Sequence, residues 1–169
     1  MMISALALLG AGRSLRDLYL FDTFEGLPRP EEIDRDLWGQ PSIEIWEKFQ
    51  KDSQDTLAFS GIEEVRKNMA STGYPSERVH YIPGLVEDTL PQSAPESIAL
   101  LRIDTDWHSS VAHSLETLFD RVVSGGFVLI DDYGHFESAR KAVDAFLTER
   151  GLRVFLQRID YTGRMFQKP

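Results

Sequence analysis

The chain has 169 residues and a formal net charge of −9, from 18 basic and 27 acidic residues, with a pI near 4.9. This length suits one domain with its own hydrophobic core. The acidic balance argues against a general nucleic-acid binder, which needs a basic face. The absence of cysteine excludes disulfides, thiolate metal sites and cysteine nucleophiles, and it fits a reducing cytosol. No apolar run reaches the roughly 20 residues of a membrane span, so we expect a cytoplasmic protein without a membrane partner.

The first half of the chain predicts short helices and strands in alternation. Apolar residues recur there at helical spacing, or stand in short runs bounded by Gly and Pro. The predicted elements are a helix over 3–9, a strand over 18–21 that ends at Asp22, a helix from 60 up to Gly73 and a strand over 79–82. The opening of the second helix, Ser60-Gly61-Ile62-Glu63, is a capping-box pattern. The first run is interpreted as a helix rather than a signal peptide, because no basic residue precedes it.

Residues 28–59 differ from their surroundings because they are rich in Pro, charge and Trp and have weak periodicity. Trp38, Trp46 and Phe49 make this segment a candidate lid that selects the substrate, and a packed surface insertion explains it equally well. The same aromatic side chains suit either a ligand or a partner chain. A homo-oligomer is therefore a further expectation.

The second half of the chain alternates more regularly. A short helix around 87–90 is expected to stop at Pro91, and Gly125-Gly126 are expected to end a later helix and begin the strand after it. The predicted elements are a strand over 100–103, a helix over 111–122, a strand over 127–130, a helix over 139–147 and an antiparallel pair over 152–156 and 163–167. This order predicts an α/β domain whose sheet is mostly parallel.

Two of these strands end in carboxylates. Asp104 follows the first and Asp131-Asp132 follow the second. Asp104 and Asp131 are 131 − 104 = 27 positions apart, enough for one crossover helix between neighbouring parallel strands. Carboxylates at one rim repel each other unless protons or a cation intervene, and Mg²⁺ prefers such oxygen ligands. The sequence therefore predicts a metal site formed by Asp104, Asp131 and Asp132. The alternative is that these acids cap the helices that follow.

Six strings carry a resemblance to a known family. They are 21–28 (FDTFEGLP), 83–91 (PGLVEDTLP), 101–107 (LRIDTDW), 125–135 (GGFVLIDDYGH), 139–144 (ARKAVD) and 159–163 (IDYTG). Their order and spacing, from about Leu18 to the C-terminus, resemble the macrocin O-methyltransferase family, SAM-dependent enzymes that methylate sugar hydroxyls of macrolide and aminocoumarin antibiotics. The family begins its cofactor site with a strand and a Glu-x-Gly-type glycine loop. Here Gly10 and Gly12 follow the first helix and cannot replace that loop.

The resemblance implies a Rossmann-like class I SAM methyltransferase fold with the first strand and the glycine loop missing, in one partial domain over residues 1–169. It implies that Asp22 accepts hydrogen bonds from the SAM ribose, although a turn cap explains Asp22 as well. It also places one loop beside the adenine of SAM. The alternative is that this loop is an ordinary turn between a strand and a helix. The residues of that loop are Gly84, Leu85, Val86 and Glu87. Asp104 completes the implied cofactor-binding set.

The resemblance also implies the chemistry. A sugar hydroxyl is a poor nucleophile while it keeps its proton, so a general base is needed. Asp104 is the first choice because the resemblance gives it both ligand and base roles, and Asp106 and His108 follow in the same loop. The predicted function is Mg²⁺- and SAM-dependent O-methylation of a sugar hydroxyl. The alternatives are a non-catalytic remnant or interaction protein without a working SAM loop, and a metal-dependent phosphoester hydrolase.

Overall fold

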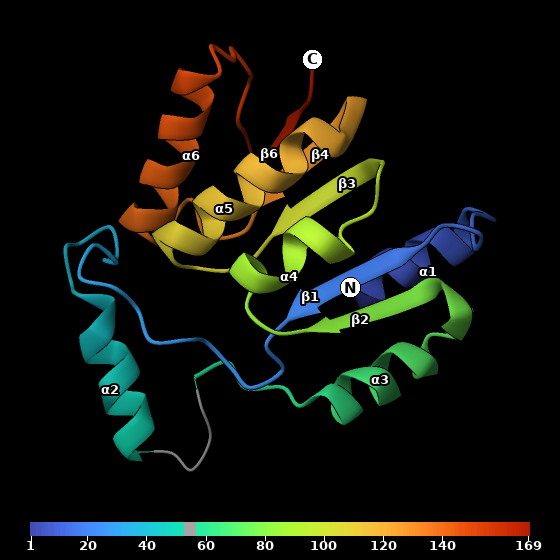
Figure 1. Ribbon diagram of the computed structural model, residues 1–169, viewed down its shortest axis with the longest axis horizontal. Helices are drawn as coiled ribbons and strands as arrows, with labels where there is room; N and C mark the ends of the chain where they lie inside the picture. Colours follow the sequence, from blue (N-terminus) through green and yellow to red (C-terminus); the bar gives the residue numbers. More distant parts are fainter. Residues whose placement is uncertain (53–56) are drawn as a thin grey trace.

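The computed structural model describes residues 1–52 and 57–169, and Figure 1 shows their arrangement. The helices are α1 (Met2–Gly10), α2 (Ser42–Asp52), α3 (Ile62–Ser71), α4 (Val86–Ser93), α5 (His108–Leu118) and α6 (Glu137–Glu149), with 3-10 turns at Ser76–Arg78 (η1) and Phe119–Arg121 (η2). The strands are β1 (Leu18–Asp22), β2 (Val79–Pro83), β3 (Ile98–Ile103), β4 (Val122–Ile130), β5 (Gln157–Arg158) and β6 (Arg164–Gln167).

The strands form two groups. β1 pairs in parallel with β2, and the other group has the order β3-β4-β6-β5. In that group β3 and β4 are parallel, while β6 is antiparallel to both β4 and β5. The predicted α/β fold, with parallel pairing and an antiparallel C-terminal pair, is confirmed. Within the described ranges, β1 and β3 each keep one edge without a strand partner.

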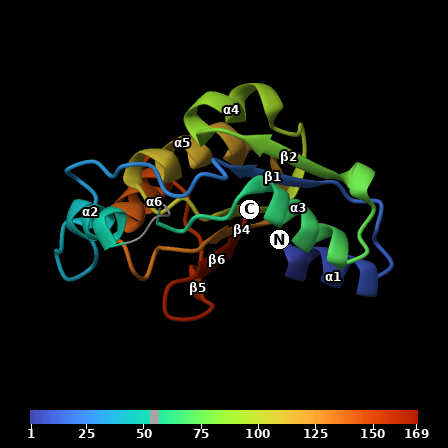
Figure 2. The ribbon, with the colours of Figure 1, turned by 90° about the horizontal axis from the view of Figure 1, so that it is seen from below.

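Helices cover both faces of the strands. α4 and α5 lie on one side and α1 lies on the other, as Figure 2 shows. One hydrophobic core joins α4, α5 and α6 to β3, β4 and β6, with Leu115, Val128 and Val143 fully buried at its centre. A second core joins α1 and α3 to β1 and includes Ala5 and Met69. The acidic strand ends belong to the elements of the first core.

Three boundary predictions for the first half are corrected. The capping box is wrong: α3 begins at Ile62 after Gly61, and no side chain caps it. The stop at Pro91 is also wrong, because α4 continues to Ser93; the missing proline N–H removes one backbone bond, which a helix tolerates near its end. The segment 28–59 contains the helix α2, which the weak periodicity of the segment did not predict. Residues 53–56 of that segment lie outside the described residues.

Two predictions for the second half are corrected as well. Val122 is not helical: α5 ends at Leu118, and β4 begins at Val122 and passes through both glycines instead of starting after them. Glycine is required at position 126 inside this strand, because a side chain would collide with the backbone. A Cβ at Gly126 would lie 2.8 Å from Val123 O and 3.1 Å from Ala99 O. Residues 152–156 are not a strand, and the short β5 that pairs with β6 lies just after them.

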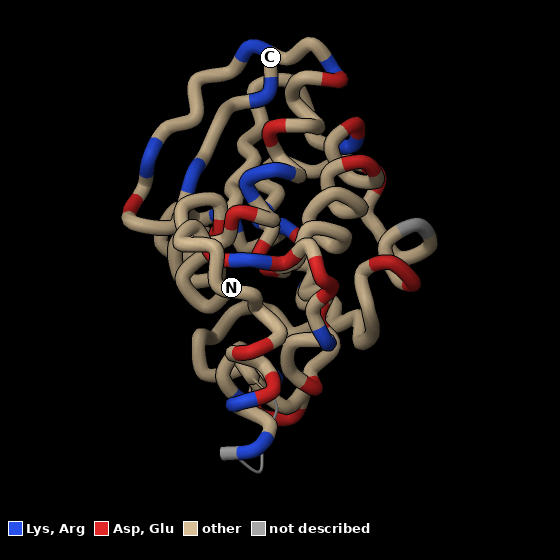
Figure 3. The backbone as a smooth tube through the Cα atoms, turned by 90° about the vertical axis from the view of Figure 1, so that its left-hand side faces the viewer, with Lys and Arg blue, Asp and Glu red and all other residues tan. Residues whose placement is uncertain are grey.

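No helix in the described part of the chain is both long and apolar enough to cross a membrane. Acidic and basic residues lie interspersed along the backbone in Figure 3.

Candidate functional site

The acidic side chains lie at the carboxyl ends of two adjacent strands. β3 and β4 run in parallel with Ile103 opposite Ile130, and the Asp131 N–H donates to Ile103 O at 2.9 Å. The residues that follow, Asp104 and Asp131, therefore leave the sheet side by side. This juxtaposition is the one that the sequence predicted from the parallel arrangement of the two strands.

Arg102 bridges these two carboxylates. Its guanidinium contacts Asp104 Oδ2 at 2.6 Å and Asp131 Oδ2 at 3.0 Å. The three side chains are between 35% and 41% exposed, so each ion pair adds little to stability. The guanidinium orients the two acids instead, since it holds one oxygen of each.

A group of three carboxylates forms next to this bridge. One oxygen each from Asp104, Asp106 and Asp132 lies within 4.8 Å of the others. The predicted ligand set contained Asp131 in place of Asp106, and it stays a prediction. The structure adds Asp106 to the candidate ligands, because the loop after β3 turns it back toward Asp132.

That turn has an unusual backbone. Asp106 has a φ of 61°, the left-handed region that costs a non-glycine residue energy, and the Trp107 N–H donates to Thr105 O at 2.6 Å across the turn. Strained residues of this kind persist when their surroundings fix them, and they gather at functional sites.

The acids perturb one another. Burial, followed by repulsion from Asp132, raises the pKa of Asp106 to about 9. Burial, followed by a hydrogen bond with Asp131, raises the pKa of Asp104 to about 7, while Arg102 acts in the opposite direction. Burial also raises the pKa of Asp132. Crowded carboxyls hold protons in this way until a cation replaces them.

The residues present fit a hard divalent cation. Asp132 Oδ2 and Thr105 Oγ1 are buried, and neither has a hydrogen-bond partner among the described residues. Buried polar oxygens normally have partners, so an oxygen left open beside two other carboxylates suits a ligand position. Carboxylate oxygens are among the donors that Mg²⁺ prefers.

A cavity of about 1300 Å³ lies between the unpaired edges of β1 and β3. All residues of both strands contribute to its lining, together with the start of α1. Asp22, Val86 and Asp104 also line it, and each had been predicted to bind the cofactor. The cavity thus brings three of the predicted cofactor residues to one space.

The other predicted cofactor residues form a turn. Gly84 has a φ of 133°, a conformation that favours glycine, and its N–H donates to Asp22 O at 3.0 Å. Leu85 is the N-cap residue of α4, and Glu87 in the first turn accepts a 2.9 Å hydrogen bond from Ser110 Oγ. Asp22 Oδ1 accepts the Phe24 N–H at 2.7 Å, which is the turn cap considered as the alternative. Its second oxygen is not used in that bond.

His108 is the first residue of α5, and Trp107 before it is only 3% exposed. The Trp107 indole packs edge-to-face on Phe136, with ring centroids 5.4 Å apart, and donates to Pro28 O at 2.9 Å. The Trp107 indole is therefore a buried packing contact of the loop. His135, in the loop after β4, lies 3.2 Å from Tyr161 Oη through Nδ1.

Sequence reasoning missed Asp34. It is 1% exposed, and its Oδ1 accepts the N–H of His108 at 2.9 Å. We call residues 28–41 the clamp segment, because they bond to the loop after β3 through Asp34 and Pro28 and to the loop after β4 through Leu37, whose N–H donates to His135 O at 2.9 Å. No local pattern marks these bonds, since the first two join residues 74 and 79 positions apart.

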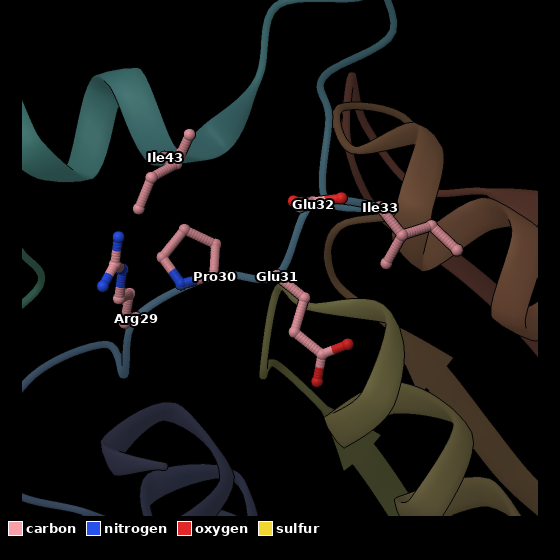
Figure 4. A pocket seen from close by; sticks show the side chains of 6 residues that line it. All are labelled: Arg29, Pro30, Glu31, Glu32, Ile33 and Ile43. Atoms are coloured by element: carbon pink, nitrogen blue, oxygen red, sulfur yellow. The ribbon is translucent and has the colours of Figure 1, made fainter.

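A smaller hollow of about 600 Å³ lies where the clamp segment passes α2. Figure 4 shows Arg29 and Pro30 facing Ile43 of α2 across it. Glu31, Glu32 and Ile33 complete its lining. The hollow therefore belongs to the segment predicted as a lid.

Comparison with known proteins gives consistent matches. The family described as macrocin-O-methyltransferase (TylF) matches residues 1–168. A Streptomyces olivaceus enzyme, 8-demethyl-8-(2,3-dimethoxy-alpha-L-rhamnosyl)-tetracenomycin-C 4'-O-methyltransferase, is 31% identical over 152 residues, which are 90% of this chain and 55% of that protein. Demethyldecarbamoylnovobiocin O-methyltransferase of Streptomyces niveus is 28% identical over 153 residues, 90% of this chain and 55% of that protein. The chain thus spans about half the length of the curated relatives it matches.

Solved structures agree with the fold. The O-methyltransferase NovP superposes with a TM-score of 0.82 at 28% identity, over 99% of this chain and 66% of that one. The calicheamicin methyltransferase CalS11 gives a TM-score of 0.73 at 21% identity, over 96% of this chain and 65% of that one, which is a likeness of fold. The class I methyltransferase fold predicted from the motifs is confirmed.

Proposed function

The chain belongs to the macrocin-O-methyltransferase family, and from that premise we propose that it is part of a SAM-dependent O-methyltransferase acting on a sugar hydroxyl of a glycoside, antibiotic or saccharide. The observation that supports a metal-assisted form of this reaction is the group of Asp104, Asp106 and Asp132, of which Asp104 also lines the cavity. The matched relatives are named for a rhamnosyl tetracenomycin and a novobiocin precursor, which supports a glycosylated acceptor.

The acidic residues would hold the cation and receive the proton. Asp104 and Asp132, with Asp106 or Asp131, would hold Mg²⁺, which when bound lowers the pKa of an acceptor hydroxyl. The bound donor would supply its methyl group to the acceptor oxygen, and its carbon–sulfur bond would break as the new carbon–oxygen bond forms. The hydroxyl proton goes to Asp104, the first choice of base, or to Asp106 or His108. Arg102 keeps Asp104 oriented during this step.

The cavity edges would hold the methyl donor. Asp22 would accept the ribose hydroxyls with the oxygen that Phe24 leaves free, and Gly84, Leu85, Val86 and Glu87 would flank the adenine. We further propose that residues 1–169 form one partial domain, that residues 28–59 act as a lid over the acceptor, and that the enzyme works in the cytoplasm. A homo-oligomer stays a prediction.

The test of catalysis uses the full-length protein. Asp104→Asn and Asp131→Asn should lower methylation of a glycoside acceptor to background, whereas Glu149→Gln, an exposed carboxylate at the end of α6, should keep wild-type turnover. EDTA should abolish turnover and added Mg²⁺ should restore it. Wild-type turnover in EDTA would contradict the metal assignment while leaving the methyl transfer itself in place.

The second candidate function is a non-catalytic remnant or interaction protein. One observation favours it. No described strand lies between the edges of β1 and β3, and the predicted cofactor residues Asp22, Val86 and Asp104 therefore line a large cavity there. Calorimetry with S-adenosylhomocysteine on the 169-residue chain separates the two functions. Saturable binding supports the enzyme, and no heat of binding with either this chain or the full-length protein supports the remnant.

A further inference from the structure

Asp34 is a buried carboxylate whose partners are backbone groups. Its Oδ2 accepts the Glu31 N–H at 2.8 Å and its Oδ1 accepts the His108 N–H at 2.9 Å. Its own N–H donates to Glu31 O at 3.1 Å, and its carbonyl accepts the Ser42 N–H at 2.9 Å. Every polar group of this residue is therefore engaged, and the side chain has one defined position.

Asp34 caps α5 from a distant part of the chain. The N-cap residue Trp107 supplies no side-chain hydrogen bond, which leaves the first N–H groups of α5 without a local partner. The carboxylate of Asp34 meets the first of them, at His108. A negative group at this end also interacts favourably with the helix dipole.

The capped end of α5 is also the end of the acidic loop. Asp104 to Trp107 connect β3 to α5, and Asp106 within them has the strained φ of 61°. Such a turn keeps its shape only when its flanks are fixed. β3 fixes one flank, while Asp34 on His108 and Pro28 on the Trp107 indole fix the other.

The clamp segment holds the second acidic loop too. The Leu37 N–H donates to His135 O, and the Glu137 N–H donates to Arg35 O, each at 2.9 Å. His135 in turn closes a backbone bond of 3.0 Å to Asp132 O. One segment thus sets the positions of both loops whose carboxylates form the acidic group.

We propose that Asp34 is a positioning residue: it fixes the Asp104–Trp107 loop so that cation affinity at the acidic group depends on the clamp segment. This inference rests on the metal site of the proposed function. The proposal implies a reciprocal effect between two ligands. If an acceptor orders the clamp segment, it strengthens cation binding, and the cation then strengthens acceptor binding by the same factor.

The experiment uses the 169-residue chain and two readouts. The variants are Asp34→Asn, which keeps the size but offers one acceptor oxygen, Asp34→Ala, which offers none, and Glu32→Gln, an exposed charge-matched control on the same segment. Hydrogen exchange reports the amides of residues 105–108, and calorimetry reports the binding of Mn²⁺, an oxygen-preferring substitute for Mg²⁺. Both are measured where thermal melts show each variant folded.

We expect exchange at residues 105–108 to accelerate about tenfold in Asp34→Asn and further in Asp34→Ala, since a hydrogen bond to a charged group is lost. Mn²⁺ affinity should fall about 10- to 100-fold, as for other residues that orient metal ligands. Glu32→Gln should change neither readout. Asp106→Asn should weaken Mn²⁺ binding and leave the His108 amide protected, because it removes a ligand and not the cap.

Two results overturn the inference. One is unchanged protection of residues 105–108 in Asp34→Asn, and the other is unchanged Mn²⁺ affinity in a variant whose loop exchange has accelerated. If Asp34→Ala does not fold, Trp107→Phe removes the hydrogen bond to Pro28 O together with part of the indole ring, and it should also loosen the loop. A wild-type chain that binds no Mn²⁺ but loses loop protection in Asp34→Asn contradicts the metal site and supports the positioning role.

Discussion

Replacing Gly134 by alanine tests how the loop after β4 is held. This glycine lies two residues after Asp132, and its N–H donates to Thr162 O at 2.8 Å. A Cβ at this position would collide with Tyr161 O and would lie 2.9 Å from Thr162 O and 3.0 Å from Thr162 Cα. All three atoms belong to the backbone, so no side-chain rotation can relieve the collision. The loop or its neighbour must move.

The magnitude follows from two terms. Inserting a methyl group into a tightly packed site costs about 1–3 kcal/mol. Separating the Gly134 N–H from Thr162 O removes a further contribution of about 1 kcal/mol. We therefore expect Gly134→Ala to lower the free energy of unfolding by about 3 kcal/mol. For a chain of this length, that corresponds to a fall in Tm of roughly 6–12 °C.

Urea denaturation followed by far-UV circular dichroism measures this loss, with the m-value confirming that the transition stays comparable. The matched control is Gly10→Ala at the end of α1, where a Cβ would meet nothing within 4 Å and where alanine should leave stability within about 0.5 kcal/mol or raise it slightly. A loss below about 1 kcal/mol in Gly134→Ala, or one no larger than that of the control, would refute the argument from backbone packing.

Two further predictions concern pH. A hydrogen bond with His80, aided by Arg78, lowers the pKa of Asp17. The Asp17 carboxylate therefore stabilises the fold at pH values above its unfolded-state pKa near 4, and this stabilisation is lost as the pH falls through its folded-state pKa. Asp17→Asn should therefore melt below wild type at pH 7 and together with it near pH 2; equal melts at pH 7 would contradict this. Burial, then a hydrogen bond to Asp144, raises the pKa of Tyr133 to about 12. The ultraviolet titration of wild type minus that of Tyr133→Phe should show one phenol ionising near pH 12, and a midpoint near 10 would contradict the assignment.

The acidic strand ends could be predicted because two local rules suffice for them. A buried strand has a continuous apolar run, and parallel neighbours end at the same edge of the sheet. Those rules place Asp104 beside Asp131, and the observed register of Ile103 opposite Ile130 agrees. The motifs of the family added the fold, which the structural comparisons confirm.

The residues that fix the acidic loops could not be predicted in this way. Asp34 lies in a segment without periodicity, and its bond to His108 joins positions 74 residues apart. The left-handed φ of Asp106, which turns its carboxylate toward Asp132, has no sequence signal such as glycine. The boundary error at Val122 has a similar origin, because packing of this buried residue on the core overrides its local preference.

The two proposed binding sites depend on the two cores to different extents. The acidic group extends from β3, β4 and α5, which share one hydrophobic core, whereas Asp22 extends from β1, which belongs to the other. The cavity that would hold the methyl donor lies between the unpaired edges of β1 and β3, so its shape depends on how the two strand groups are spaced. The cation site depends on the first core and on the clamp segment, whereas the donor site depends on both cores, since Val86 and Asp104 line the cavity as well as Asp22. Cation binding and binding of the methyl donor therefore test different parts of the molecule, and a chain that binds Mn²⁺ but not S-adenosylhomocysteine would place the defect at the β1–β3 gap and not at the acidic group.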